Sequence, residues 1–247
     1  VLSQALLLCL GGFLITGSSN AFNQIWERDL DKLMARTKSR PLAQGRLAVF
    51  ESLVVAFVLG FTGIGLLWFL NDTCAVLGVL ALVLYVAVYT PLKTITPLAV
   101  FVGAIPGSIP PMLGFIAASG NFGLEAGVLF MIQFFWQFPH FWAIAWKLDD
   151  DYKKAGFRLL PSGNRDKQSA FQIMLYSSFL IPIAMLPWAI NLCGINSMAF
   201  AVVASIAMMV PSFRLFKSMN VEQASQLMFF SFVYLPLVLF VFFLDKL

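Results

Sequence analysis

The chain has 247 residues, of which 60% are hydrophobic and 11% are charged, and its formal net charge is +4. An ordinary soluble domain carries about 25% charged residues and about 45–50% apolar residues. A soluble surface cannot be covered with so few polar groups, and the mean hydropathy of +0.86 agrees. The composition therefore predicts an integral membrane protein. It excludes a secreted disulfide scaffold, a nucleic-acid-binding module and a disordered chain.

Eight apolar stretches are long enough to cross a bilayer, which takes about 20 residues per helix. None shows the alternation expected of barrel strands, so we expect an all-α protein. The first stretch is interpreted as a transmembrane helix rather than a signal peptide, and we expect the natural chain to begin before Val1. The predicted spans are residues 1–22, 47–70, 73–91, 97–119, 123–147, 169–190, 194–213 and 225–244.

The segments between the predicted spans are alternately rich and poor in lysine and arginine, and 15 of the 16 such residues lie in every second segment. Basic residues in short loops mark the inner side of a membrane, so this set predicts the topology. Eight helices then place both ends outside, and a ninth helix before Val1 would return the N-terminus to the inside.

Small residues and prolines in the spans predict where helices pack. Glycines let helix backbones approach closely in lipid, and prolines predict a bent or broken fourth span. The cysteines form no CxxC motif and are expected to be apolar packing residues. These residues are Gly60, Gly63, Gly65, Gly103, Gly107 and Gly114; Pro106, Pro110 and Pro111; and Cys9, Cys74 and Cys193.

Polar residues recur at helical spacing where the first apolar stretch ends. Asn23, Glu27 and Asp31 stand at i, i+4 and i+8, so at about 100° per residue they form one stripe on a helix; we call them the polar row. Asn20 lies one turn earlier, and Asp29 points about 160–200° away from its acidic neighbours. One interpretation is a solvated helix end whose acids pair with adjacent basic residues. Side-chain amides inside an apolar stretch need hydrogen-bonding partners, which favours a functional site over a solvated helix end.

A second polar cluster ends the fifth span. It contains WQFPH at 136–140, which holds the chain's one histidine, and the acidic run 149–151. On a continuous helix Lys147 and Asp151 lie about 20° from His140. Structural and functional roles for His140 stay equally open, although an ionisable residue inside a membrane favours function.

Two acidic clusters at one membrane face predict a site for a hard cation such as Mg²⁺, which proteins hold with carboxylates and substrate phosphates. Nearby basic residues suit a phosphate, although the positive-inside rule also accounts for them. A lipid diphosphate is the substrate expected for such a site. Some of the 26 Phe and 6 Trp would stabilise the allylic cation left when diphosphate departs. The basic residues are Arg36, Lys38, Arg40, Lys93, Lys153, Lys154 and Arg158.

Several motifs together resemble the UbiA superfamily of intramembrane prenyltransferases. The polar row followed by RTKSRPL at 36–42 is similar to the first acidic motif of that superfamily. YTPLK at 89–93, GAIPGSIPP at 103–111, WQFPH at 136–140 and DDY at 150–152 resemble the branch that farnesylates heme.

The resemblance implies a polytopic helix bundle with a central cavity, forming one transmembrane prenyltransferase domain over 1–247, with the first of nine helices missing. It implies Mg²⁺-dependent transfer of the farnesyl group of farnesyl diphosphate to a vinyl group of heme B, giving heme O. The expected location is the bacterial plasma (inner) membrane, or the mitochondrial inner membrane in a eukaryote, with the active site on the cytoplasmic or matrix side. Heme A synthase or terminal oxidase assembly is the implied protein partner, and no nucleic acid is expected.

The resemblance also implies roles for individual residues. Mg²⁺ binding and catalysis fall to Asn23, Glu27, Asp31, Asp150 and Asp151, with Lys93 also catalytic. Diphosphate binding falls to Arg36, Lys38, Arg40, Lys93 and Lys154. Heme binding falls to Trp136, Gln137 and His140.

The chain departs from the superfamily pattern at Glu27, where the pattern has Asp, and a carboxylate with one more methylene still suits Mg²⁺. Three alternatives stay open. A related prenyltransferase would act on a quinone precursor or a chlorophyll-type ring, and WQFPH argues against it. An ion-coupled transporter would show internal repeats and acids near the bilayer midplane. A heme-binding assembly factor would not need both acidic clusters.

Overall fold

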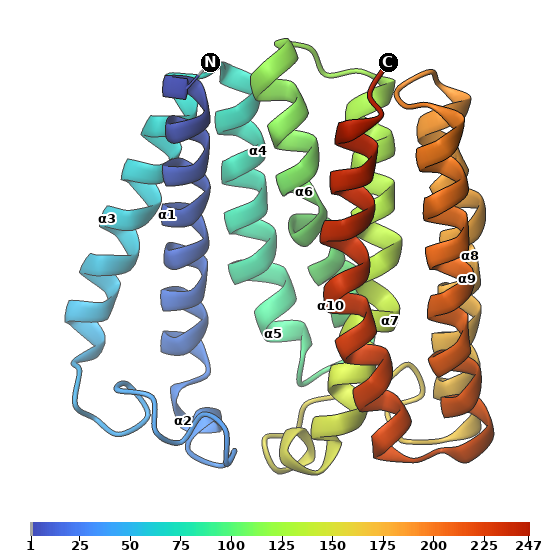
Figure 1. Cartoon of the computed structure of the whole chain (residues 1–247). Helices are drawn as coiled ribbons and strands as arrows, with labels where there is room; N and C mark the ends of the chain where they lie inside the picture. The colour runs from blue at the N-terminus through green and yellow to red at the C-terminus, as the bar shows by residue number, and fades with distance from the viewer. Residues whose placement is uncertain (1) are drawn as a thin grey trace. The chain divides into compact units, whose positions relative to one another are not determined.

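The computed structural model describes residues 2–247, and these residues are almost entirely helical (Figure 1). Eight of their helices are long and apolar enough to cross a membrane, which confirms the predicted spans and makes the chain a multi-pass integral membrane protein. The eight spans are α1 (Leu2–Trp26), α3 (Val49–Trp68), the continuous helix Asp72–Leu92 that begins with α4 (Asp72–Val83), α6 (Ala99–Ser119), α7 (Leu124–Lys154), α8 (Lys167–Ala189), α9 (Ile195–Ser218) and α10 (Val221–Leu244). The short elements are α2 (Arg28–Asp31), the π-helix η1 (Leu84–Tyr89) and α5 (Thr90–Leu92), and η1 and α5 continue α4.

The helices divide into two compact units. The first comprises the chain up to Phe122 together with Asp150–Arg158, and the second comprises Gly123–Asp149 and Leu159–Leu247. The single domain expected over residues 1–247 stays a prediction.

In the first unit, α1 packs along α3 through small residues (Figure 1). A Cβ added to Gly63 would lie 2.8 Å from Cγ1 of Ile15 and 2.9 Å from the carbonyl oxygen of Gly11. One helical turn earlier on α3, an added Cβ at Gly60 would lie 2.9 Å from Oγ of Ser18. The packing role predicted for Gly60 and Gly63 is therefore confirmed.

The same prediction is wrong for Gly65 and Gly114, since an added Cβ at either would meet no atom within 4 Å. Residues 99–119 form one unbroken helix through Pro106, Pro110 and Pro111. Of the two predicted outcomes the break is therefore absent, and the bend stays a prediction. A membrane helix tolerates proline when other groups satisfy the freed carbonyls.

Replacing Gly63 with Val is expected to separate α1 from α3 and to lower the free energy of unfolding by about 1–3 kcal/mol, the usual cost of overpacking a close contact. Gly65→Val, two residues away on the same helix, is the control and should cost little. Thermal unfolding in detergent would measure both. Equal destabilisation by the two variants would contradict the close approach.

In the second unit, α9 packs against both α8 and α10. A buried hydrogen bond of 2.8 Å between Oγ of Ser205 and the hydroxyl of Tyr234 joins α9 to α10. Aromatic rings fill the space between α7 and α8, where the ring centroids of Phe138 and Tyr176 are 4.7 Å apart. The helix α7 runs to Lys154, seven residues beyond the predicted end of its span.

Candidate active site

The polar row lies on one buried stripe, as predicted. The α-helix α1 ends at Trp26, but the helical hydrogen bonds continue, from the Glu27 amide to the Asn23 carbonyl at 2.9 Å and from the Asp31 amide to the Glu27 carbonyl at 2.7 Å. Asn23, Glu27 and Asp31 are 6%, 3% and 0% exposed, whereas the side chain of Asp29 is 67% exposed. The opposite orientation predicted for Asp29 is confirmed.

The neighbouring basic residues do not neutralise the row. Arg28 and Lys32 instead pair with Asp29, at 3.2 and 2.6 Å. The hydrogen bond from Lys32, followed by that from Arg28, holds the pKa of the Asp29 carboxyl below its usual range. The interpretation of a solvated helix end, with Glu27 and Asp31 paired to these two residues, is therefore wrong.

Glu27 binds a lysine that directly follows the α4–η1–α5 helix. Nζ of Lys93 lies 2.7 Å from Oε1 of Glu27, and the two side chains are 9% and 4% exposed. Nζ also lies 4.7 Å from the ring centroid of Tyr89 and 5.7 Å from that of Phe157. The ammonium group is thus held by one carboxylate and two aromatic rings.

The π-helix η1 sets this arrangement, and the sequence reasoning missed it. Pro91 has no amide hydrogen and crowds the carbonyl four residues earlier, which explains a widened turn just before it; such turns often occur at functional sites. The hydroxyl of Thr90 donates to the Tyr85 carbonyl at 2.9 Å and accepts from Nδ2 of Asn23 at 3.3 Å. Asn23 is thereby anchored to this helix.

Tyr89 was also missed as a site residue. An added Cβ at Gly103 would lie 2.7 Å from the Tyr89 ring, so the glycine of α6 makes room for the ring that lies beside Lys93. The only sequence signals were the motifs at 89–93 and 103–111, which do not show that they touch.

Asp31 binds an arginine from the loop between α2 and α3. Nη1 of Arg40 lies 2.9 and 2.8 Å from the two carboxylate oxygens, and the hydroxyl of Thr37 donates to the Asp31 backbone carbonyl at 3.1 Å. The side chain of Arg40 is 28% exposed, against 1% for that of Asp31. Both carboxylates of the row therefore face a cation, Glu27 one from a distant helix and Asp31 one from the loop that follows α2.

Asp151 contacts the same loop through backbone amides. Its carboxylate accepts from the amides of Ala35 and Arg36, at 2.9 and 3.3 Å, and from Nζ of Lys154 at 3.3 Å. The predicted Mg²⁺ ligand Asp150 is exposed, as are Arg36, Lys38 and Lys154 of the predicted diphosphate-binding set. Within residues 2–247 no three Asp, Glu, His or Cys side chains are grouped closely enough to hold a metal, so the five-residue ligand set stays a prediction.

The residues predicted to bind heme lie buried in the second unit. The rings of Trp136 and His140 stack with centroids 4.5 Å apart. Nδ1 of His140 is 2.7 Å from Oγ of Ser231, and Nε1 of Trp136 donates to the Ser231 carbonyl at 2.9 Å. Gln137 is 2% exposed. These contacts fix Trp136 and His140 against α10, and the role of all three side chains toward heme stays a prediction.

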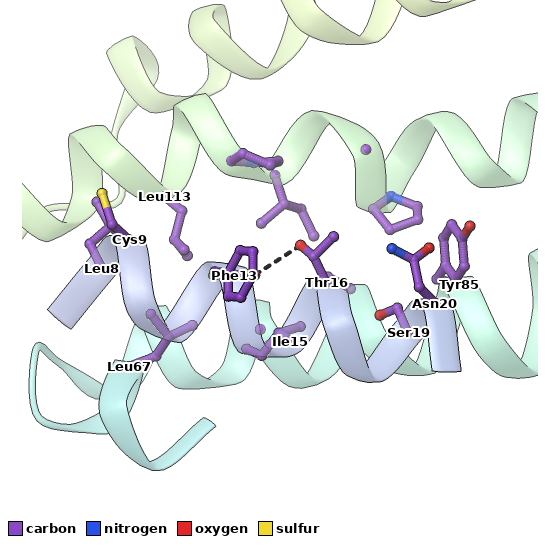
Figure 2. Close-up of a pocket in the computed structure, with 17 residues that line it drawn as sticks. Leu8, Cys9, Phe13, Ile15, Thr16, Ser19, Asn20, Leu67, Tyr85 and Leu113 are labelled. Carbon is purple, nitrogen blue, oxygen red and sulfur yellow. Dashed lines mark hydrogen bonds between the residues drawn. The ribbon is translucent and has the colours of Figure 1, made fainter. Parts of the chain in front are cut away.

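An apolar cavity of about 460 Å³ runs beside α1, between α1, α4 and α6. Figure 2 shows Leu8 and Cys9 at one end, and Ser19, Asn20 and Tyr85 at the other. Asn23 follows Asn20 by about one helical turn, so the polar end of the cavity leads toward the polar row. The arrangement suits a ligand with an apolar chain and a charged head.

These features define a multi-pass α-helical membrane protein in which a buried acid–base cluster adjoins an apolar cavity. The model of the UbiA prenyltransferase family matches residues 2–234, and the chain belongs to that family.

Similar proteins agree with this assignment. The chain is 47% identical to a protein named protoheme IX farnesyltransferase from Flavobacterium psychrophilum, over 98% of this chain and 82% of that one. It is 49% identical to a protein of the same name from Christiangramia forsetii, over 97% and 81%.

Solved structures show the same fold. A structure described for digeranylgeranylglyceryl phosphate synthase superposes with a TM-score of 0.82 at 20% identity, over 99% of this chain and 86% of that one. A UbiA homologue from Archaeoglobus fulgidus bound to GPP and Mg²⁺ gives 0.69 at 14% identity, over 98% and 88%.

Proposed function

We propose that this chain transfers the farnesyl group of farnesyl diphosphate to a vinyl group of heme B, giving heme O, in a Mg²⁺-dependent reaction. The observation that carries the proposal is the buried polar row with Lys93 and Arg40 on its two carboxylates. Support for the acceptor comes from the relatives named protoheme IX farnesyltransferase, which match almost the whole chain.

The polar row has the chemistry of a magnesium ligand set. Mg²⁺ prefers oxygen ligands and is usually held by one or two carboxylates together with substrate phosphates. Glu27 and Asp31 offer two carboxylates, and Asn23 offers an amide oxygen. When bound, Mg²⁺ would stabilise the negative charge that develops on the departing diphosphate. We propose Asp150 and Asp151 as further ligands of the Mg²⁺–diphosphate complex.

The basic residues around the row would stabilise the leaving group. Lys93 lies beside Glu27, and Arg40 comes from the loop that also carries Arg36 and Lys38. A guanidinium binds phosphate in a fork, and an ammonium binds it as a point charge. Lys154 would add a further exposed cation. The C1–oxygen bond of the substrate then breaks, its electron pair leaves on the diphosphate, and the farnesyl group becomes an allylic cation.

The apolar cavity beside α1 would hold the farnesyl chain, with C1 at its polar end near Asn20 and Tyr85. Aromatic faces such as that of Tyr89 can stabilise a cation, and the apolar lining keeps bulk water from quenching it. The π electrons of the heme vinyl group form the new carbon–carbon bond. One water then supplies the hydroxyl group of heme O and releases a proton.

We propose that Trp136, Gln137 and His140 contact or orient the heme. His140→Ala is expected to raise the KM for heme B by about tenfold, as loss of about 1.4 kcal/mol of binding would do, and to leave the KM for farnesyl diphosphate unchanged. Steady-state rates with each substrate varied would measure both constants. Ser231→Ala, which removes only the partner of Nδ1, should act in the same direction and less. A raised KM for farnesyl diphosphate alone would assign His140 to the other half of the site.

The proposed location is a bacterial plasma (inner) membrane, or a mitochondrial inner membrane in a eukaryote, with the site on the cytoplasmic or matrix side. The proposed side is based on the concentration of basic residues in every second segment between the spans. Heme A synthase or terminal oxidase assembly is the proposed protein partner, because heme O must be passed on to a consuming step.

Mass spectrometry of the porphyrin tests the acceptor. The purified chain, farnesyl diphosphate and Mg²⁺ would be incubated with heme B and an aromatic quinone precursor in competition. The expected product is heme that has gained a farnesyl group and a water, and a chelator should abolish it. Prenylation of the quinone precursor with unmodified heme would contradict the proposed acceptor.

A further inference from the structure

The two carboxylates of the polar row are each neutralised by a cation from outside the helix that carries the row. Lys93 is 66 residues from Glu27, and Arg40 reaches back nine residues across the loop to Asp31. Three of the four side chains are less than a tenth exposed, and only Arg40 reaches water, at 28%. The row is therefore an electrically balanced cluster before any ligand is added.

A divalent cation alone would disturb this balance. A metal ion bound to Glu27 and Asp31 would lie close to the Lys93 ammonium and the Arg40 guanidinium, and like charges at contact distance repel strongly where water is scarce. If the metal displaced the ammonium, a buried cation would be left without a counter-ion, which is costly. Free Mg²⁺ is therefore expected to bind weakly.

A diphosphate removes this penalty, because it provides anionic oxygens for the displaced cations. From these contacts we infer that Lys93 and Arg40 are exchangeable internal counter-ions, which move from the carboxylates to the diphosphate when the metal takes the carboxylates. The inference rests on the proposed function. It predicts that metal and diphosphate bind as a coupled pair, each weakly without the other.

The surroundings of Lys93 allow such an exchange. Its main chain is fixed, since its carbonyl accepts the Arg158 amide at 2.8 Å. Its ammonium contacts the rings of Tyr89 and Phe157 at 4.7 and 5.7 Å. A ring face attracts a cation without fixing its direction as a carboxylate does. Nζ can therefore turn from Glu27 toward a diphosphate while keeping its aromatic contacts.

Equilibrium dialysis with Mn²⁺ tests this coupling without measuring turnover. The full chain in detergent would be dialysed against Mn²⁺, with and without inorganic pyrophosphate, and the excess Mn²⁺ on the protein side gives the bound fraction. For the unaltered chain, pyrophosphate should raise the apparent Mn²⁺ affinity by about 5- to 150-fold, the usual range of coupling between sites.

Lys93→Gln should tighten Mn²⁺ binding in the absence of pyrophosphate and reduce the enhancement that pyrophosphate gives. Without the competing ammonium, Mn²⁺ alone should bind at least about fivefold more tightly, and the enhancement by pyrophosphate should fall below about fivefold. Arg40→Gln should act in the same way, and its partly exposed side chain makes it the safer variant for folding. Lys32→Gln is the matched control, because Lys32 pairs with the exposed Asp29, and both affinities should be unchanged.

Three results would overturn the inference in distinguishable ways. Tight Mn²⁺ binding that pyrophosphate does not change would refute the coupling and leave the proposed function standing. Weaker Mn²⁺ binding to both Lys93→Gln and Arg40→Gln would refute the exchange, because it would make these residues supports of the metal site rather than competitors. No Mn²⁺ binding with or without pyrophosphate would refute the proposed metal site and the inference with it.

Discussion

Replacing Asp31 with Asn is expected to lower farnesyl transfer by about 10²–10³-fold, the usual cost of removing one preorganised charge-stabilising group. Asp31 is fully buried and binds Arg40 through both carboxylate oxygens. The amide would keep the shape of the side chain and lose its charge, so both the metal ligand and the anchor of Arg40 would weaken. Heme O formation under saturating Mg²⁺ would measure the effect.

Asp29→Asn is the control for this variant. It makes the same chemical change two residues away on the opposite side of the helix, where the side chain is 67% exposed and pairs with Arg28 and Lys32. Transfer should stay within about twofold, since surface pairs contribute about 0–1 kcal/mol. Equal loss of transfer in both variants would contradict the role of the polar row.

Replacing Lys93 with Met is expected to lower the free energy of unfolding by about 3–5 kcal/mol, the cost of leaving one partner of a buried ion pair unpaired. The unpaired group would be Glu27, whose side chain is 4% exposed. Transfer should be abolished as well, because the proposed diphosphate site would lose a buried cation. Thermal unfolding in detergent would measure the first effect and heme O formation the second.

The double variant Glu27→Gln with Lys93→Met separates stability from function. It removes both charges, and replacing a buried ion pair with neutral groups is often neutral or stabilising. Stability should therefore recover while transfer stays abolished. Recovery of transfer in the double variant would show that the ion pair serves the fold alone.

Residues close together in the sequence were predicted well. The spans follow from hydropathy, which needs no tertiary information. The orientation of the polar row, with Asp29 on the other side, follows from helical geometry. Both depend on neighbours within a few turns, and both are confirmed for the residues that the structure describes.

The partners of those residues were not predicted. The loop conformation that takes Arg40 back to Asp31, and the packing that places Lys93 on Glu27, depend on contacts between distant segments. Nearby Arg28 and Lys32 were the obvious candidates from sequence, and they pair elsewhere. The π-helix before Pro91 was missed. Pro91 lacks an amide hydrogen, and the sequence alone did not show that the helix would widen at this point rather than break.

The prolines of α6 show how far local rules reach. Pro106, Pro110 and Pro111 predicted a bent or broken helix, and the helix continues through all three without a break. Local propensity is weak evidence when packing can satisfy the freed carbonyls.

A crystal structure of the chain with farnesyl thiodiphosphate and Mn²⁺ would test the proposed site most directly, because anomalous scattering locates the metal independently. We expect an Mn²⁺ peak between the carboxylates of Glu27 and Asp31, with the diphosphate against Lys93 and Arg40 and the farnesyl chain in the cavity beside α1. A metal and diphosphate bound away from the polar row, with the Lys93–Glu27 pair intact, would contradict the proposed site.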